Sequence, residues 1–75
     1  MYAYILIGLD EPSEREVLEE LSNYSEVVEG HLLFGEWDII LKINVKSSEE
    51  VTSFLIDRVR HIKSVRLTST LMVAE

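Results

Sequence analysis

Residues 26–45 read E-V-V-E-G-H-L-L-F-G-E-W-D-I-I-L-K-I-N-V, and this stretch decides the fold. Two runs rich in β-branched and aliphatic residues, 26–34 and 38–45, predict two strands. Gly35 lies between them and marks a tight reversal of the chain. The second run has aliphatic residues at every other position, namely Ile39, Leu41, Ile43 and Val45. This alternation indicates a strand with one buried face, and we expect an antiparallel hairpin.

An aromatic and β-branched run precedes the hairpin. Residues 2–8 predict a strand that is buried on both faces, which places it centrally in a sheet. Ser13 and Glu16 then have the spacing of a capping box, and apolar residues follow at helical intervals. A first helix is therefore expected between this strand and the hairpin.

The segment after the hairpin repeats the same arrangement. Ser47 and Glu50 again have capping-box spacing, and apolar residues recur at helical period as far as Ile62. Residues 65–73 predict a last strand. Its alternation predicts Val65, Leu67, Leu71 and Val73 on one face and Arg66, Thr68, Thr70 and Met72 on the other.

The resulting order, βαββαβ, predicts an α+β fold of the ferredoxin-like kind, formed by one domain over residues 1–75. Its four-stranded antiparallel sheet has the order 4-1-3-2, and both helices cover one face. The uncovered face is expected to carry Tyr2, Tyr4, Leu6, Ile40, Lys42, Asn44, Thr68, Thr70 and Met72. Such an apolar face marks an association surface. We therefore expect a sheet-to-sheet dimer of the α/β-barrel type, with Tyr2, Tyr4, Leu6, Ile40 and Met72 in its interface.

Charge and composition exclude several classes of function. The chain has 7 Lys and Arg against 14 Asp and Glu, a net charge of −7, so a phosphate backbone would repel it. It has no cysteine, no secretory signal and no apolar run near the roughly 20 residues of a membrane span. His31 and His61 lie in different predicted elements with no further ligands nearby. We therefore expect a cytoplasmic protein without metal, cofactor, nucleic acid or membrane partner.

Polar residues are predicted to converge at one edge of the sheet. Asp38 opens the third strand, and Thr68 and Thr70 are expected on the corresponding face of the fourth. A carboxylate suits an ammonium group, while hydroxyls and free amides at Gly35 suit a carboxylate, so an amino-acid-sized site is predicted. Each residue also has a purely structural explanation: Gly35 as a turn glycine, Asp38 as a polar residue at the start of a strand, and the two threonines as ordinary strand residues. Trp37 beside the turn is either a ligand cap or an interface anchor.

Three stretches together resemble the Lrp/AsnC family: E-V-V-E-G-H, F-G-E-W-D-I-I-L-K-I and V-R-L-T-S-T-L-M-V. From Ala3 to Val73 the chain resembles the C-terminal effector domain of these regulators, the RAM domain. The resemblance implies dimers that join through their sheets, rings of dimers such as an octamer or decamer, and an amino acid bound between dimers. It also implies a ligand site that includes G-x-x-D and T-x-T. The residues carried over are Gly35, Asp38, Thr68 and Thr70, with Glu36, Trp37 and Ser69 between them.

The chain begins directly at the first strand, so the resemblance predicts a stand-alone version without the helix-turn-helix domain. Such a version is expected to sense amino acids and to modulate a full-length Lrp/AsnC regulator. Two alternatives stay open: an interaction module without ligand, and a dimeric α/β-barrel enzyme that uses Tyr2, Tyr4 and Lys42. Since no catalytic grouping is present, we expect no enzyme.

Overall fold

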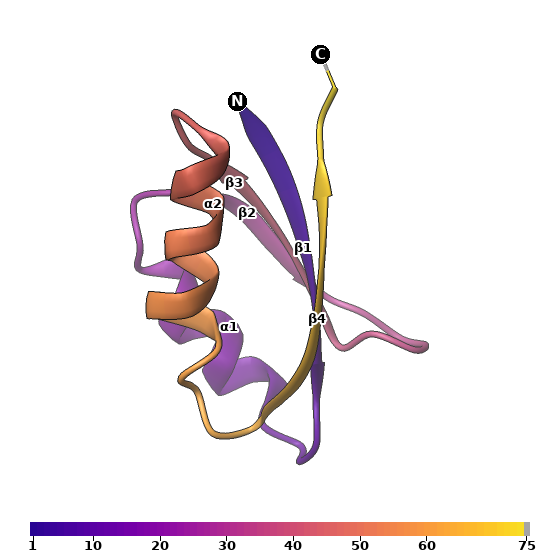
Figure 1. The fold of residues 1–75 in the computed structure, drawn as a ribbon. Helices are drawn as coiled ribbons and strands as arrows, with labels where there is room; N and C mark the ends of the chain where they lie inside the picture. Colours follow the sequence, from indigo (N-terminus) through magenta and orange to yellow (C-terminus); the bar gives the residue numbers. More distant parts are fainter. Residues whose placement is uncertain (75) are drawn as a thin grey trace.

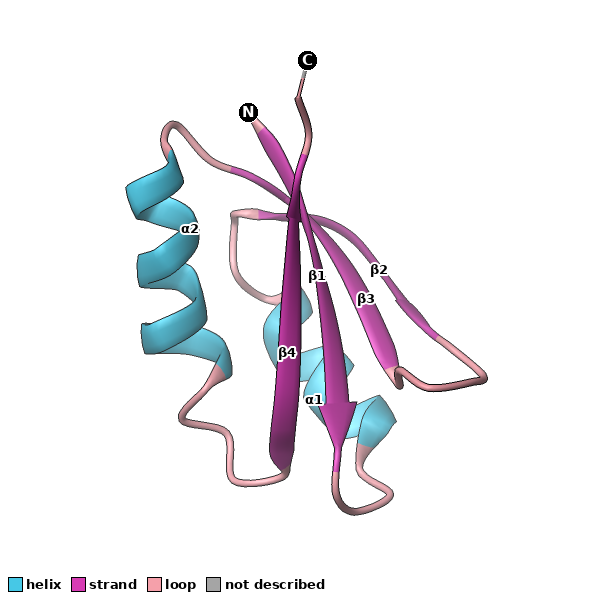
Figure 2. Ribbon diagram, turned by 45° about the vertical axis from the view of Figure 1, so that its right-hand side comes forward, coloured by secondary structure: helices cyan, strands magenta, loops and turns pink. Residues whose placement is uncertain are grey.

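The chain folds as βαββαβ in a computed structural model, which describes residues 1–74. The elements are β1 (Tyr2–Leu9), α1 (Glu14–Ser22), β2 (Val27–Leu32), β3 (Ile39–Asn44), α2 (Ser48–Phe54), a π-helical turn η1 (Leu55–Val59) that continues α2, and β4 (Val65–Met72). The strands pair antiparallel in the order β2-β3-β1-β4, with both helices on one side (Figures 1 and 2). The predicted fold and strand order are confirmed.

The core lies between the helices and the covered face of the sheet. Ile5 and Ile7 of β1 are fully buried there beside Leu41 of β3, while Leu21 of α1 and Phe54 of α2 pack onto them. The alternation predicted for β3 is confirmed, since its odd-numbered aliphatic residues are the buried ones. None of the helices within residues 1–74 is both long and apolar enough to cross a membrane.

The opposite face of β1 is only half-buried in the single chain. Tyr4 and Leu6 are partly exposed and Tyr2 is 41% exposed, because no helix lies over this side. The prediction that β1 is buried on both faces is therefore wrong for one chain, although its central place in the sheet is correct. We call this uncovered side the open face.

The predicted facing of β4 is wrong, because a β-bulge changes the alternation. Leu9 pairs with Val65 and Gly8 pairs with Leu67, which leaves Arg66 as an extra residue on β4. Directly opposed residues share a face, so the bulge reverses the parity of every later residue. Opposite Ile7, Ile5 and Ala3 on the covered side stand Thr68, Thr70 and Met72, whereas Leu67, Ser69 and Leu71 stand on the open face.

Of the two serines with capping-box spacing, only one caps its helix. Ser47 caps α2 as predicted, since its Oγ accepts a hydrogen bond from the backbone N–H of Glu50 at 3.3 Å. Ser13 lies at the N-cap of α1 but makes no such bond. Its hydroxyl instead donates to Ser64 Oγ at 3.0 Å, which ties the start of α1 to the loop before β4.

Candidate functional site

The hairpin between β2 and β3 extends beyond the sheet (Figure 1). The strand ends at Leu32 rather than at Phe34, so the reversal is longer than predicted and spans residues 33–38. The backbone N–H of Leu33 donates to the carbonyl of Asp38 at 2.9 Å and closes the loop. Gly35 has a φ of +128°, which only glycine adopts readily, and Phe34 beside it is fully exposed.

Asp38 is held at the point where the hairpin meets β1. Its backbone N–H donates to the carbonyl of Ile7 at 2.9 Å, and its Oδ2 accepts from the N–H of Leu9 at 2.7 Å. The side chain therefore satisfies the last amide of β1 and is fixed in position. Its other carboxylate oxygen has no hydrogen-bond partner within residues 1–74.

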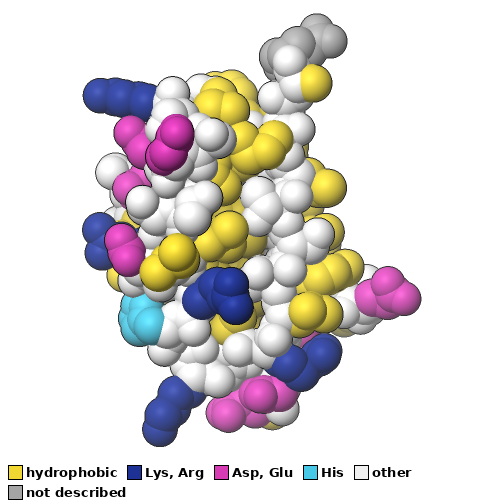
Figure 3. Space-filling view, viewed as in Figure 1, with side chains coloured by type: hydrophobic (Ala, Val, Ile, Leu, Met, Phe, Trp, Pro, Cys, Tyr) yellow, Lys and Arg dark blue, Asp and Glu magenta, His cyan; other side chains and the backbone are white. Residues whose placement is uncertain are grey.

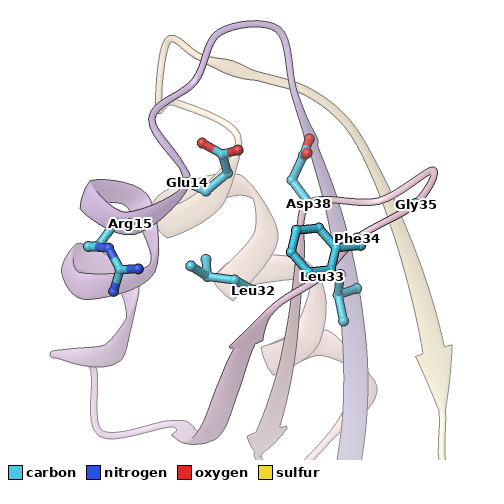
Figure 4. A pocket seen from close by; sticks show the side chains of 7 residues that line it. All are labelled: Glu14, Arg15, Leu32, Leu33, Phe34, Gly35 and Asp38. Atoms are coloured by element: carbon cyan, nitrogen blue, oxygen red, sulfur yellow. The ribbon is translucent and has the colours of Figure 1, made fainter.

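A cavity of about 540 Å³ lies between this hairpin and the start of α1. Its lining consists of Glu14, Arg15, Leu32, Leu33, Phe34, Gly35 and Asp38. Figure 4 shows Glu14 and Arg15 entering from α1 and Asp38 from the opposite side, with Leu32 and Phe34 below the two carboxyl groups. We call it the hairpin cavity. It combines negative charge, one guanidinium and apolar walls.

Two of the residues expected at the ligand site, Gly35 and Asp38, line the hairpin cavity. Glu36 and Trp37 belong to the same loop, where Glu36 is exposed and Trp37 half-buried. Glu14 and Arg15 were missed from the sequence. The available signal was the acidic first turn of α1, which the helix dipole alone also explains.

The threonines of T-x-T do not reach this cavity within one chain. Thr68 lies on the covered side of β4, which is separated from β3 by β1, and it lines a second cavity. The predicted convergence of Asp38 with Thr68 and Thr70 on one face is therefore wrong, because the bulge at Arg66 turns both threonines to the other face. Their part in ligand binding stays a prediction.

Two side chains outside the hairpin cavity, Lys42 and His31, have identifiable partners. Lys42 on the open face lies over two aromatic rings, with its Nζ 4.5 Å from the centre of Tyr2 and 5.9 Å from that of Tyr4. His31 lies 3.8 Å from Glu29. Within residues 1–74, no group of three His, Asp or Glu residues is placed to hold a metal ion.

Known proteins with similar sequences and folds identify the family of this chain. Residues 2–75 match the family described as the Lrp/AsnC ligand binding domain. PH1916 of Pyrococcus horikoshii, an uncharacterized HTH-type transcriptional regulator, is 40% identical over an alignment of 73 residues, and the match covers 93% of this chain and 49% of that protein. The chain thus spans about half the length of the curated relatives it matches.

Solved structures show the same fold. FFRP-DM1 superposes with a TM-score of 0.89 at 30% identity, and the match covers 96% of each chain. The regulator NMB0573 of Neisseria meningitidis, solved as a complex with L-Met, has a TM-score of 0.85 at 20% identity over 99% of this chain and 49% of its own. This family consists of ligand-binding regulatory domains, and the enzyme alternative is set aside. The chain belongs to the Lrp/AsnC ligand binding domain family.

Proposed function

We propose that this domain senses an amino acid in the hairpin cavity and transmits its presence through assembly with other copies. The observation that carries this proposal is the composition of the cavity, in which Glu14 and Asp38 face an opening beside Arg15 and apolar residues. Its volume of about 540 Å³ falls in the range of small-molecule sites.

The lining matches each part of a zwitterionic amino acid. Carboxylates of Glu14 and Asp38 suit the ammonium group, and the guanidinium of Arg15 suits the carboxylate. Leu32 and Phe34 offer apolar surface to the side chain of the ligand. We therefore favour an amino acid with an apolar side chain. The L-Met complex of NMB0573 is a relative's precedent for such a ligand.

The T-x-T residues are proposed to contribute to the ligand site of a neighbouring dimer. Thr68, Ser69 and Thr70 cannot join the hairpin cavity of their own chain. The family resemblance puts the ligand between dimers, so we propose that these residues of a second dimer close the site. Phe34, which projects from the hairpin without any cover, is suited to contact that second dimer.

We further propose that the open face forms the dimer interface. The bulge makes this face more apolar than expected, since it adds Leu67 and Leu71, which are 50% and 54% exposed. Lys42 fits such an interface because its charge rests on Tyr2 and Tyr4. Dimers are proposed to form a ring of eight or ten chains.

A transcriptional role follows from the relatives. Their names describe HTH-type transcriptional regulators, and this chain matches about half of their length. We propose that the domain acts in the cytoplasm by pairing with such a regulator through the shared open face. Co-expression of the two chains, one tagged, should then yield mixed dimers, and Leu71→Asp should abolish them.

The binding site is tested by calorimetry with each of the twenty amino acids. We expect one or a few apolar amino acids to bind, and both Glu14→Gln and Asp38→Asn to weaken binding at least about tenfold, because each removes a charged hydrogen-bond acceptor. Glu16→Gln is the matched control, since Glu16 lies in the same helical turn but outside the cavity lining. Equal affinity in all three variants would refute the assigned site.

A further inference from the structure

A second cavity, of about 260 Å³, lies by the first residues of β4. Its lining residues are Arg60, Val65, Arg66, Leu67 and Thr68, so it is lined by two arginines and a threonine and by no acidic residue. We call it the arginine cavity. Its charge is opposite to that of the hairpin cavity, and the two share no residue.

Arg60, which lines this cavity, directly follows a π-helical turn at the end of the second helix. The backbone N–H of Arg60 donates to the carbonyl of Leu55 at 2.8 Å, five residues earlier, instead of four as in an α-helix. Single π turns of this kind are rare and occur frequently at functional sites. The turn shifts the last residues of the helix relative to a regular α-helical ending.

Arg66 reaches the same cavity through a different irregularity. It is the extra residue of the β-bulge, opposite no residue of β1. Bulges redirect a side chain and are enriched beside active sites. The Nη2 atom of Arg66 lies 3.6 Å from where a Cβ on Gly8 would stand, so the guanidinium lies beside Gly8 of β1. Two independent backbone irregularities therefore deliver two arginines to one cavity.

The guanidinium groups of Arg60 and Arg66 have no partner in the part of the chain that the structure describes. Within residues 1–74 neither makes an ion pair or a side-chain hydrogen bond, although the chain has twice as many acidic as basic residues. Arg58, by contrast, lies 4.6 Å over the ring of Tyr24. Figure 3 shows Lys and Arg side chains on the lower half of this face, with Asp and Glu side chains beside them at its lower edge. Two like charges sharing one polar cavity favour a bound anion.

We propose that the arginine cavity binds a small oxyanion, the phosphate or carboxylate group of a metabolite. The planar guanidinium groups of Arg60 and Arg66 would each donate paired hydrogen bonds to its oxygens. Because the site opens next to β4, where the T-x-T residues lie, an anion bound there is placed to influence the contact between dimers. The domain would thus sense a second metabolite besides the amino acid.

Calorimetric titration with sodium phosphate, and separately with sodium succinate, tests this site against sodium chloride of equal ionic strength. The wild type should bind phosphate or succinate saturably, and the tighter of the two identifies the class of oxyanion. Arg60→Gln with Arg66→Gln should weaken binding by at least about tenfold. Arg58→Gln is the matched control and should bind like the wild type, since its guanidinium lies on Tyr24.

The inference is overturned if neither anion binds more than chloride does, or if the double variant binds as tightly as Arg58→Gln. A third outcome also overturns it: the wild type binds no anion, and the double variant forms smaller assemblies than the wild type. The two arginines would then make an ionic contact between copies. Circular dichroism melting of each variant establishes that it folds. Asp38→Asn should keep full phosphate affinity, which separates failure of this site from failure of the amino-acid site.

Discussion

The covered face and the open face of the sheet are formed by alternate residues of the same strands, yet they differ in how far their side chains are exposed. On the covered side Ala3, Ile5 and Ile7 are fully buried by the helices. On the open side Tyr2, Leu67 and Leu71 remain 41% to 54% exposed. The two helices of this 75-residue chain cover one face only, and the proposed dimer would cover the apolar residues of the other face.

The largest expected contrast is between two adjacent residues of β1. Ile5→Ala should lower the free energy of unfolding by about 2–5 kcal/mol, because it opens a cavity in the core. Leu6→Ala should cost much less at protein concentrations low enough to dissociate dimers, and more as the concentration rises. Urea unfolding of both variants across a range of concentrations measures this. Equal, concentration-independent losses would contradict the distinction between the faces.

A smaller effect is expected from two strand glycines that differ in their surroundings. A Cβ on Gly30 would lie 2.7 Å from Leu18 Cδ1 and 2.9 Å from Leu41 Cδ2, between β2 and α1. Gly30→Ala should therefore destabilise the fold by about 1–3 kcal/mol. The control is Gly8→Ala, where the nearest atoms are at 3.6 Å or more. Thermal unfolding of both variants measures the difference. If Gly30→Ala proved at least as stable as Gly8→Ala, tight packing at Gly30 would be contradicted.

The smallest change concerns association alone. Leu71→Ser should weaken the dimer by about tenfold or more without altering the fold, since two symmetric copies of this side chain leave the interface. Thr70→Ser, one residue away on the covered side, should change the dimer dissociation constant by less than about threefold. Sedimentation equilibrium gives both constants. If Thr70→Ser weakened the dimer and Leu71→Ser did not, the interface would not lie on the open face, and the proposed dimer would be contradicted.

The sequence predicted the fold where one local pattern decided it. Alternation in β3 gave its buried face, and the glycine at the reversal gave the hairpin, from which strand order followed. It failed at β4 because the bulge residue Arg66 has no signature in a strand pattern of alternating residues. It failed at Ser13 because the hydroxyl of this residue is directed to Ser64, which is distant in the sequence, and not to the first turn of α1.

The candidate site was predictable only in the part that lies within one loop. Gly35 and Asp38 are three residues apart in a hairpin, so their proximity needed no tertiary information. Glu14 and Arg15 come from another element, and only the packing of α1 against β2 brings them to the same cavity. The arginine cavity was hidden for the same reason, since it depends on two backbone irregularities that meet in space.

The coupling of amino-acid binding to assembly is tested most directly by the light-scattering mass of the protein with and without each of the twenty amino acids. A ligand bound between dimers must shift the assembly equilibrium by mass action. The account predicts a mass above that of a dimer that changes with one or a few apolar amino acids, and no such change in Asp38→Asn. The same mass in the presence of all twenty amino acids would contradict it.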